Sequence, residues 1–395
     1  EHISTQGSAE HAYAPVFKPV PNFERNPYYM TTPIFYVNGE PHIGHLYTML
    51  IADITCRWKR LNGTDVFLMS GTDEHGAKVQ EASVKAGFDS PLEFCDKVSE
   101  TFRTAWAQFG IQYDAFVRTT SAEHAQSVSW MWQQLAKNGY IYKGKHEGWY
   151  CRSDETFVPE IQLVKQQDGT FRTASGHTVE WISEDNYKFR LSAFAPLLQD
   201  YYKSNPDAIT PSHMRTIVLS MLSHGMEDIS ISRLASKLQW GVPVPGDDEH
   251  KVYVWLDALN IYLTGARTAT KKAKFRGALP SLLARSTNSD ASTITAANTS
   301  PSCERSAEML QRVEEHAREL RQDPEGQRYL AESAPFWPNS VQLIGKDILK
   351  FHCIYWPAFL LGCGLPLPRR TVAHSHWTVE GQKMSKSLGT SKIGR

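Results

Sequence analysis

The chain lacks a net charge, a long apolar run and any Cys-x-x-Cys pair. Its 42 lysines and arginines balance 42 aspartates and glutamates over 395 residues, which excludes a polybasic protein but not a local basic groove. Six separate cysteines predict neither a disulfide framework nor a zinc knuckle, and they favour a reducing compartment. The most apolar run, 351–368, is interrupted by His352, Pro357 and glycines, so we expect a core helix and no membrane span.

Strand and helix patterns alternate through the first third of the chain. The aromatic and β-branched run 28–37 predicts a strand, and Leu46, Met49, Leu50 and Ile54 share one face of a helix over about 45–60. Further strands are predicted at 66–70 and 113–118, and further helices from 76 and over 121–137, the last capped by Ser121. This alternation is typical of an α/β fold with a parallel sheet.

The pattern changes near residue 143. Short strand-like pieces between glycine turns over 143–182 predict a small β-rich insertion, whereas 251–264 predicts a strand running into a helix. Residues 265–303 have a loop-like Ser, Thr, Ala and Asn composition, and 304–321 predicts a surface helix with Leu310, Val313, Ala317 and Leu320 on one side. An α/β pattern resumes at Val341.

The first motif that suggests chemistry is Pro41-His42-Ile43-Gly44-His45, between a strand and a helix. A helix N-terminus offers N–H groups and a positive dipole end to phosphate, and Gly44 permits close approach of a flat base. His42 and His45 could donate to phosphate oxygens. Taken alone, the motif is explained equally well by histidines that merely cap the helix.

The second motif is Lys383-Met384-Ser385-Lys386-Ser387, followed by Leu388-Gly389. Two lysines three residues apart, among small hydroxyl residues, can wrap a loop round a polyphosphate. Taken alone, a solvated lysine loop explains it better.

Together the two motifs resemble the paired signatures of class I aminoacyl-tRNA synthetases. TTPIFYVNGEPHIGH, SGTDEHG, YVWLDAL, IGKDILKFH and GQKMSKS resemble methionyl-tRNA synthetases of the bacterial and mitochondrial type, over about 28–264 and 337–390. The resemblance implies a Rossmann-like catalytic domain with an inserted connective domain. It divides the chain into an extended arm (1–27), a first catalytic half (28–142), a zinc-free connective insertion (143–240), a second catalytic half (241–264 and 334–390) and a low-complexity and helical insertion (265–333).

The implied reaction joins methionine to ATP as methionyl-adenylate and then transfers the methionyl group to tRNA(Met). His42, His45, Lys383 and Lys386 would be catalytic. These four would also bind ATP, with Mg²⁺ bridging its phosphates, together with Gly44, Gly345, Asp347, Met384 and Ser385. Asp73 would pair with the α-ammonium of methionine. The rest of the methionine pocket would comprise Ile34, Tyr36, Trp255, Ala258, Leu259, Tyr262, Ile348 and His352.

Three departures from the family pattern temper this expectation. Cys151-Arg152-Ser153-Asp154 lacks a second cysteine, so we expect no zinc and a structural Cys151. The basic cluster Arg267, Lys271, Lys272, Lys274 and Arg276 could touch tRNA phosphates, although a solvated loop explains it more simply. The chain also stops at Arg395, where family members continue into an anticodon-binding region, which puts tRNA charging in doubt more than adenylate formation.

Two alternatives follow. One is a truncated, impaired product that binds nucleotide or tRNA without charging. Another is a leucyl or valyl enzyme, which the short connective segment disfavours because it leaves no room for a large editing domain. We expect a monomer in the mitochondrial matrix, with a bacterial cytoplasm as the alternative.

Overall fold

The computed structural model describes residues 27–151, 156–158, 160, 163–166, 169–173, 176–275, 301–333, 335–375, 378–379 and 382–383. Within these ranges, no helix combines the length and the apolar character that crossing a membrane requires.

A parallel sheet forms the centre of the molecule, with strand order β10-β16-β15-β1-β3-β2 and β4 also paired with β3. All of its recorded strand pairs are parallel, which confirms the predicted fold class. The strands are β1 (Tyr28–Thr31), β2 (Phe35–Tyr36), β3 (Val66–Asp73), β4 (Ala115–Arg118), β10 (Ile209–Thr210), β15 (Val341–Gly345) and β16 (Thr371–His374).

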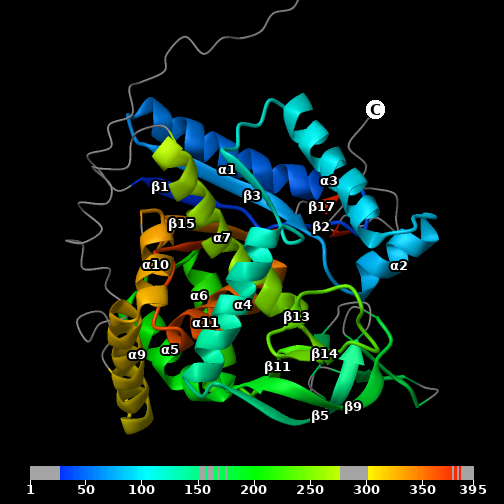
Figure 1. The fold of residues 1–395 in the computed structure, drawn as a ribbon, viewed down its shortest axis with the longest axis vertical. Coiled ribbons are helices and arrows are strands. Elements are labelled where there is room, and N and C mark those ends of the chain that lie inside the picture. Colours follow the sequence, from blue (N-terminus) through cyan, green and yellow to red (C-terminus); the bar gives the residue numbers. More distant parts are fainter. Residues whose placement is uncertain are drawn as a thin grey trace, which may run out of the picture.

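Helices cover both faces of this sheet (Figure 1). Successive strand residues point to opposite faces, so Tyr29 packs in a cluster with helix residues such as Leu259, whereas Met30 packs with Ala52 and Cys56. On the first face lie α4 (Ala122–Lys137), α7 (Val254–Phe275) and α11 (Trp356–Gly362). On the other face lie α1 (Ile43–Leu61) and α3 (Pro91–Gln108), with α2 (Ala77–Lys85) beside α3.

The predicted strand over 28–37 is two strands. β1 ends at Thr31 and β2 begins at Phe35, with Pro33 between them. Proline has no N–H to donate to a neighbouring strand, so the strand is interrupted at Pro33. The interrupted segment forms part of the candidate site described below. The predicted cap of α4 is confirmed, because the Ser121 hydroxyl accepts from the His124 N–H at 3.3 Å.

The β-rich region contains a sheet of order β11-β9-β5-β6. The expectation of short strands was wrong for its centre, where β5 and β9 pair antiparallel from Ile141↔Phe189 to Tyr150↔Glu180. Glycine turns suggested breaks, but Gly144 and Gly148 lie within the ladder. The strands of this region are β5 (Ile141–Cys151), β6 (Thr156–Val158), β7 (Leu163–Lys165), β8 (Phe171–Thr173), β9 (Glu180–Phe189), β11 (Ile229–Ser230), β12 (Ser232–Leu234), β13 (Pro243–Val244) and β14 (Asp247–Val252).

The stretch 143–240, expected as one connective insertion, contributes a strand to the central sheet. Inside it, β10 pairs in parallel with β16 and belongs to the central sheet. The flanking helices α5 (Leu191–Ser204) and α6 (Ser212–Ser223) contribute Phe194, Leu198 and Val218 to the main core. The antiparallel strands form separate sheets, although Phe189 and Val252 also pack in the main core.

Helix α7 continues past the boundary expected at residue 264 and ends at Phe275. Its last turns bury Ala266, Ala269 and Ala273, a helical spacing that the Thr- and Lys-rich composition obscured. Beyond 300, α9 (Glu304–Gln322) agrees with the helix predicted over 304–321 and packs against α5, and α10 (Pro324–Ser333) packs against α7.

Candidate active site

One cavity of about 330 Å³ brings together all nine side chains that the resemblance assigned to methionine, with Pro33, Lys78 and Val254 as further lining residues. It opens at the carboxyl ends of β2 and β3, which is where parallel α/β sheets place ligands. Tyr36 and Asp73 end these strands, and Ile34 directly precedes β2. Trp255, Ala258, Leu259 and Tyr262 come from the first turns of α7, and Ile348 and His352 follow β15.

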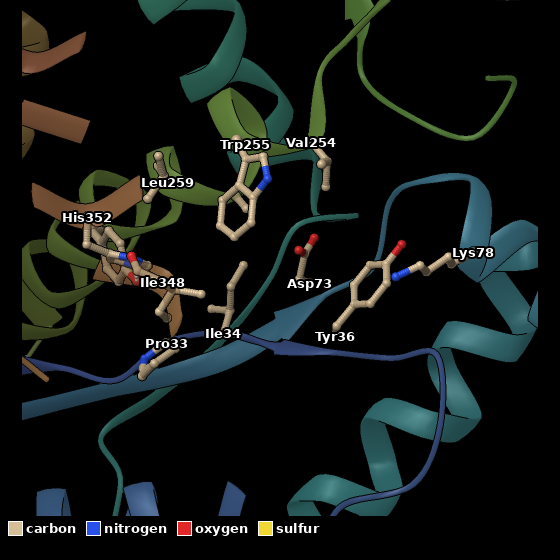
Figure 2. A pocket seen from close by; sticks show the side chains of 12 residues that line it. Pro33, Ile34, Tyr36, Asp73, Lys78, Val254, Trp255, Leu259, Ile348 and His352 are labelled. Atoms are coloured by element: carbon tan, nitrogen blue, oxygen red, sulfur yellow. Dashed lines mark hydrogen bonds between the residues drawn. The ribbon is translucent and has the colours of Figure 1, made fainter. Parts of the chain in front are cut away.

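Figure 2 shows how these side chains divide the cavity. Asp73 and Tyr36 lie toward one end, His352 lies at the other, and Ile34 and Trp255 stand between them. Trp255 is held by Phe351, whose ring stacks on it at 3.5 Å with an interplanar angle of 6°. The cavity is therefore apolar along its length, with a carboxylate at one end.

Tyr262 and His352 form a polar pair at the other end. His352 Nδ1 lies 2.9 Å from the Ile348 carbonyl, which only accepts, so Nδ1 carries the proton. Nε2 then accepts from the Tyr262 hydroxyl at 2.6 Å. Complete burial lowers the pKa of His352 to about 4, so the ring is neutral near pH 7.

His42 and His45 stand at the N-terminus of α1. His42 Nδ1 accepts from the Gly44 N–H at 3.1 Å, and His45 Nδ1 accepts from the His42 N–H at 3.4 Å. The two rings stack with centroids 3.5 Å apart. Both histidines therefore take part in the cap, which fixes their rings at the positive end of the helix dipole.

Gly345 and Asp347 lie where β15 ends and the short 3₁₀ helix η2 (Lys346–Ile348) begins. Sequence reasoning missed His374, at the end of the neighbouring β16. Its Nε2 lies 2.9 Å from Thr48 Oγ1 on α1, so it joins that helix to this edge of the sheet. The signal available in the sequence was a histidine that closes the short run Thr371-Val372-Ala373, which is rich in β-branched residues.

Sequence reasoning also missed Lys78, in the first turn of α2. Its ammonium lies 5.9 Å from the centroid of the Tyr36 ring, at the end of the cavity that Tyr36 lines. Lys78 follows Asp73 by five residues, which would place it beside the same strand end.

The lysine motif is only partly within the described residues. Lys383 ends β18 (Gln382–Lys383), which pairs antiparallel with β17 (Thr378–Val379). Met384, Ser385 and Lys386 lie outside the described residues.

Within the described residues, no three or more His, Cys, Asp or Glu side chains lie together as the binding of a metal ion would require. Cys151 is buried in β5.

A family model described as tRNA synthetases class I (M) matches residues 28–280 and 312–392. The internal stretch that the match leaves out, 281–311, is shorter than the insertion expected over 265–333. Among curated relatives, the human mitochondrial methionine–tRNA ligase is 44% identical over 91% of this chain and 52% of its own length. The methionine–tRNA ligase of Rickettsia felis is 38% identical over 93% of this chain and 59% of its own.

A solved structure gives the same family. Mycobacterium tuberculosis methionyl-tRNA synthetase in complex with methionyl-adenylate is 36% identical with a TM-score of 0.72, over 93% of this chain and 60% of that one. The chain spans about half the length of the curated relatives it matches. By motifs, fold and pocket, the chain belongs to the class I (M) tRNA synthetase family.

Proposed function

We propose that this chain activates methionine with ATP and donates the methionyl group to tRNA(Met). The observation that carries the proposal is the gathering of all nine predicted methionine residues around one cavity. Its volume lies at the small end of the ~300–1,000 Å³ range of ligand sites. The relatives that match are named for this reaction.

The cavity suits the thioether of methionine. A flexible, uncharged sulfur side chain is best held by apolar and aromatic groups, with the sulfur near ring edges. Ile34, Trp255 and Leu259 would supply that surface. Asp73, at the opposite end from His352, would pair with the α-ammonium and so orient the carboxylate toward ATP.

ATP would lie between the α1 N-terminus and the end of β15. The capped His42 and His45 would contact the phosphates, Gly345 would admit the nucleotide, and Asp347 would bind the ribose. Mg²⁺ would arrive on the phosphates of ATP, as is usual for nucleotide substrates. Lys383, Met384, Ser385 and Lys386 would hold the β- and γ-phosphates. Adenylation needs alignment and charge stabilisation more than covalent help.

The end of the tRNA would enter a second cavity. A space of about 600 Å³ shares Lys78 and Val254 with the methionine cavity and extends between α2 and β9. The half-exposed Trp181 offers an aromatic face there, and Lys237 lies beside it in an ion pair with Glu184 at 2.5 Å. Stacking on aromatic rings beside basic groups is how single-stranded nucleic acid ends are held.

We also propose a mitochondrial location and a monomeric state. Several relatives are named mitochondrial, including those of Neurospora crassa and Saccharomyces cerevisiae. Fractionation of the source cells and sedimentation of the purified protein would test the two statements.

The direct test is ATP–pyrophosphate exchange with methionine, leucine and valine. We expect exchange with methionine and at least tenfold less with the others. Asp73→Asn should lower kcat/KM for methionine about 30-fold or more, because the buried ammonium would lose its charge partner. No exchange by the wild type would contradict the proposal, and exchange without tRNA charging would restrict it to adenylate formation.

Asp200→Asn is the matched control. Asp200 is a buried carboxylate that accepts from the Ser302 N–H and hydroxyl at 2.7 and 2.6 Å, and it does not line the cavity. Its amide variant should lose stability but keep the KM for methionine.

A further inference from the structure

Beside the methionine cavity lies a buried trio of side chains that the proposed reaction does not use. His75 Nδ1 lies 2.7 Å from Asp257 Oδ2, and His124 Nε2 lies 2.7 Å from Asp257 Oδ1. All three residues are buried. Burying charged groups costs free energy unless they are paired, so the burial of these three ionisable side chains calls for a structural or functional explanation.

The direction of these hydrogen bonds follows from the charge of Asp257. Burial alone would raise its pKa, but the two facing histidines outweigh burial and hold the pKa well below its usual value. Asp257 is therefore an anion that only accepts, so His75 donates from Nδ1 and His124 donates from Nε2. His124 Nδ1 in turn lies 2.9 Å from the Thr264 hydroxyl on α7. The hydrogen bonds of the trio therefore link α4, α7 and the segment that follows β3.

The His75–Asp257 bond joins the two main walls of the cavity. His75 comes two residues after Asp73, which ends β3. Asp257 lies in the first turn of α7, between Trp255 and Ala258. This bond joins two residues that are 182 positions apart in sequence. It fixes the position of the segment after β3 relative to α7, beside the cavity.

The backbone around His75 is fixed independently. Glu74 is fully buried and accepts from Arg118 Nε at 2.7 Å, and its carbonyl accepts from Trp240 Nε1 at 2.5 Å. Gly76 adopts a φ of 111°, which other residues rarely reach, and donates to the Trp240 carbonyl at 3.1 Å. From this anchored loop, the side chain of His75 extends to α7 and bonds Asp257.

We propose that His75 is a positioning residue which, through Asp257, sets the spacing between Asp73 and the α7 wall and thereby the affinity for methionine. His124 holds the second oxygen of Asp257 and fixes its orientation. This inference rests on the proposed methionine activation. It assigns His75 no contact with substrate, so its loss should change the binding of methionine but not that of ATP.

The test compares His75→Asn with His75→Gln. Asparagine places an N–H near the position of Nδ1, whereas glutamine places it near that of Nε2, so the pair differs in where the donor lies. In exchange kinetics we expect H75Q to raise the KM for methionine about tenfold or more, with kcat and the KM for ATP within twofold. H75N should stay within about threefold of the wild type.

Stability and active-site content separate this role from a structural one. The burst of adenylate formation gives the fraction of active enzyme, and thermal unfolding gives Tm for each variant. D200N should lower Tm without moving either KM. H124Q, which keeps an N–H near Nε2, should behave like H75N, and His124→Leu like H75Q.

Several outcomes would overturn the inference while leaving the proposed function intact. An active wild type with an unchanged methionine KM in H75Q would do so. Equal increases in the methionine and ATP KM values, or an H75N variant no better than H75Q, would also do so. A wild type without exchange would instead count against the proposed function itself, and methionine affinities from calorimetry would then decide whether H75Q weakens binding as expected.

Discussion

His352 makes stability depend on pH at the scale of one residue. Its folded pKa is about 4, below the ordinary value of 6.5, so the unfolded chain takes up a proton first as the pH falls. Stability should therefore decline between pH 6.5 and pH 4 and be unaffected by this group above that window. The shift corresponds to about 3 kcal/mol of unfolding free energy.

Urea unfolding at several pH values, with His352→Asn as comparison, measures this contribution. The amide nitrogen of asparagine can still donate to the Ile348 carbonyl, as Nδ1 does, but it does not titrate. The difference in unfolding free energy between wild type and H352N should shrink by about 3 kcal/mol from pH 7 to pH 4. Parallel curves would show that the ring is not buried as a neutral base.

At the scale of an element, α7 depends on a close crossing with the sheet. A Cβ at Gly265 would lie 2.4 Å from Tyr29 Oη and 2.9 Å from Met69 Cε. Alanine normally favours a helix interior by about 1 kcal/mol over glycine, but here overpacking should win. We expect Gly265→Ala to lower the free energy of unfolding by about 1–3 kcal/mol, measured in urea.

Tyr29→Phe gives the control for this crossing. It removes the nearest atom and also the hydrogen bond from Tyr29 Oη to the Tyr262 carbonyl, at 3.1 Å. Alone it should cost about 1 kcal/mol. In the double variant the two losses should sum to less than their separate values, because the clash is partly relieved. Strict additivity would mean that α7 yields at Gly265 without contacting Tyr29.

At the scale of the whole molecule, local patterns predicted the sheet and the motifs but not how distant segments join. The strand–helix alternation could be identified because periodicity is local, and the nine pocket residues were implied by the resemblance of short local motifs to a known family. β10 was missed because two residues carry no periodicity, and its place is set by pairing with β16. The His75–Asp257–His124 trio was missed because it forms only when β3, α4 and α7 meet.

The same lesson applies to the basic cluster after residue 264, which the sequence left open between a solvated loop and a tRNA contact. Lys272 donates to the Asp114 carbonyl, and Arg267 donates from Nε and Nη2 to Glu332 Oε2 at 2.9 and 2.6 Å. Lys271 pairs with Glu123 at 2.7 Å. These three cations thus join α7 to neighbouring segments. The contribution of each one to the free energy of unfolding should increase with its burial.

Arg267→Ala and Lys271→Ala compare a half-buried with an exposed ion pair in one helix. The side chains of Arg267 and Glu332 are 16% and 30% exposed, against 52% and 53% for Lys271 and Glu123. In urea, R267A should lose about 1.5–3 kcal/mol of unfolding free energy, because a charge-assisted pair and its packing over Tyr329 are removed. K271A should lose at most about 0.5 kcal/mol. The salt dependence of tRNA binding should be the same for K271A as for the wild type, whereas a slope reduced by about one would assign Lys271 to a phosphate contact instead.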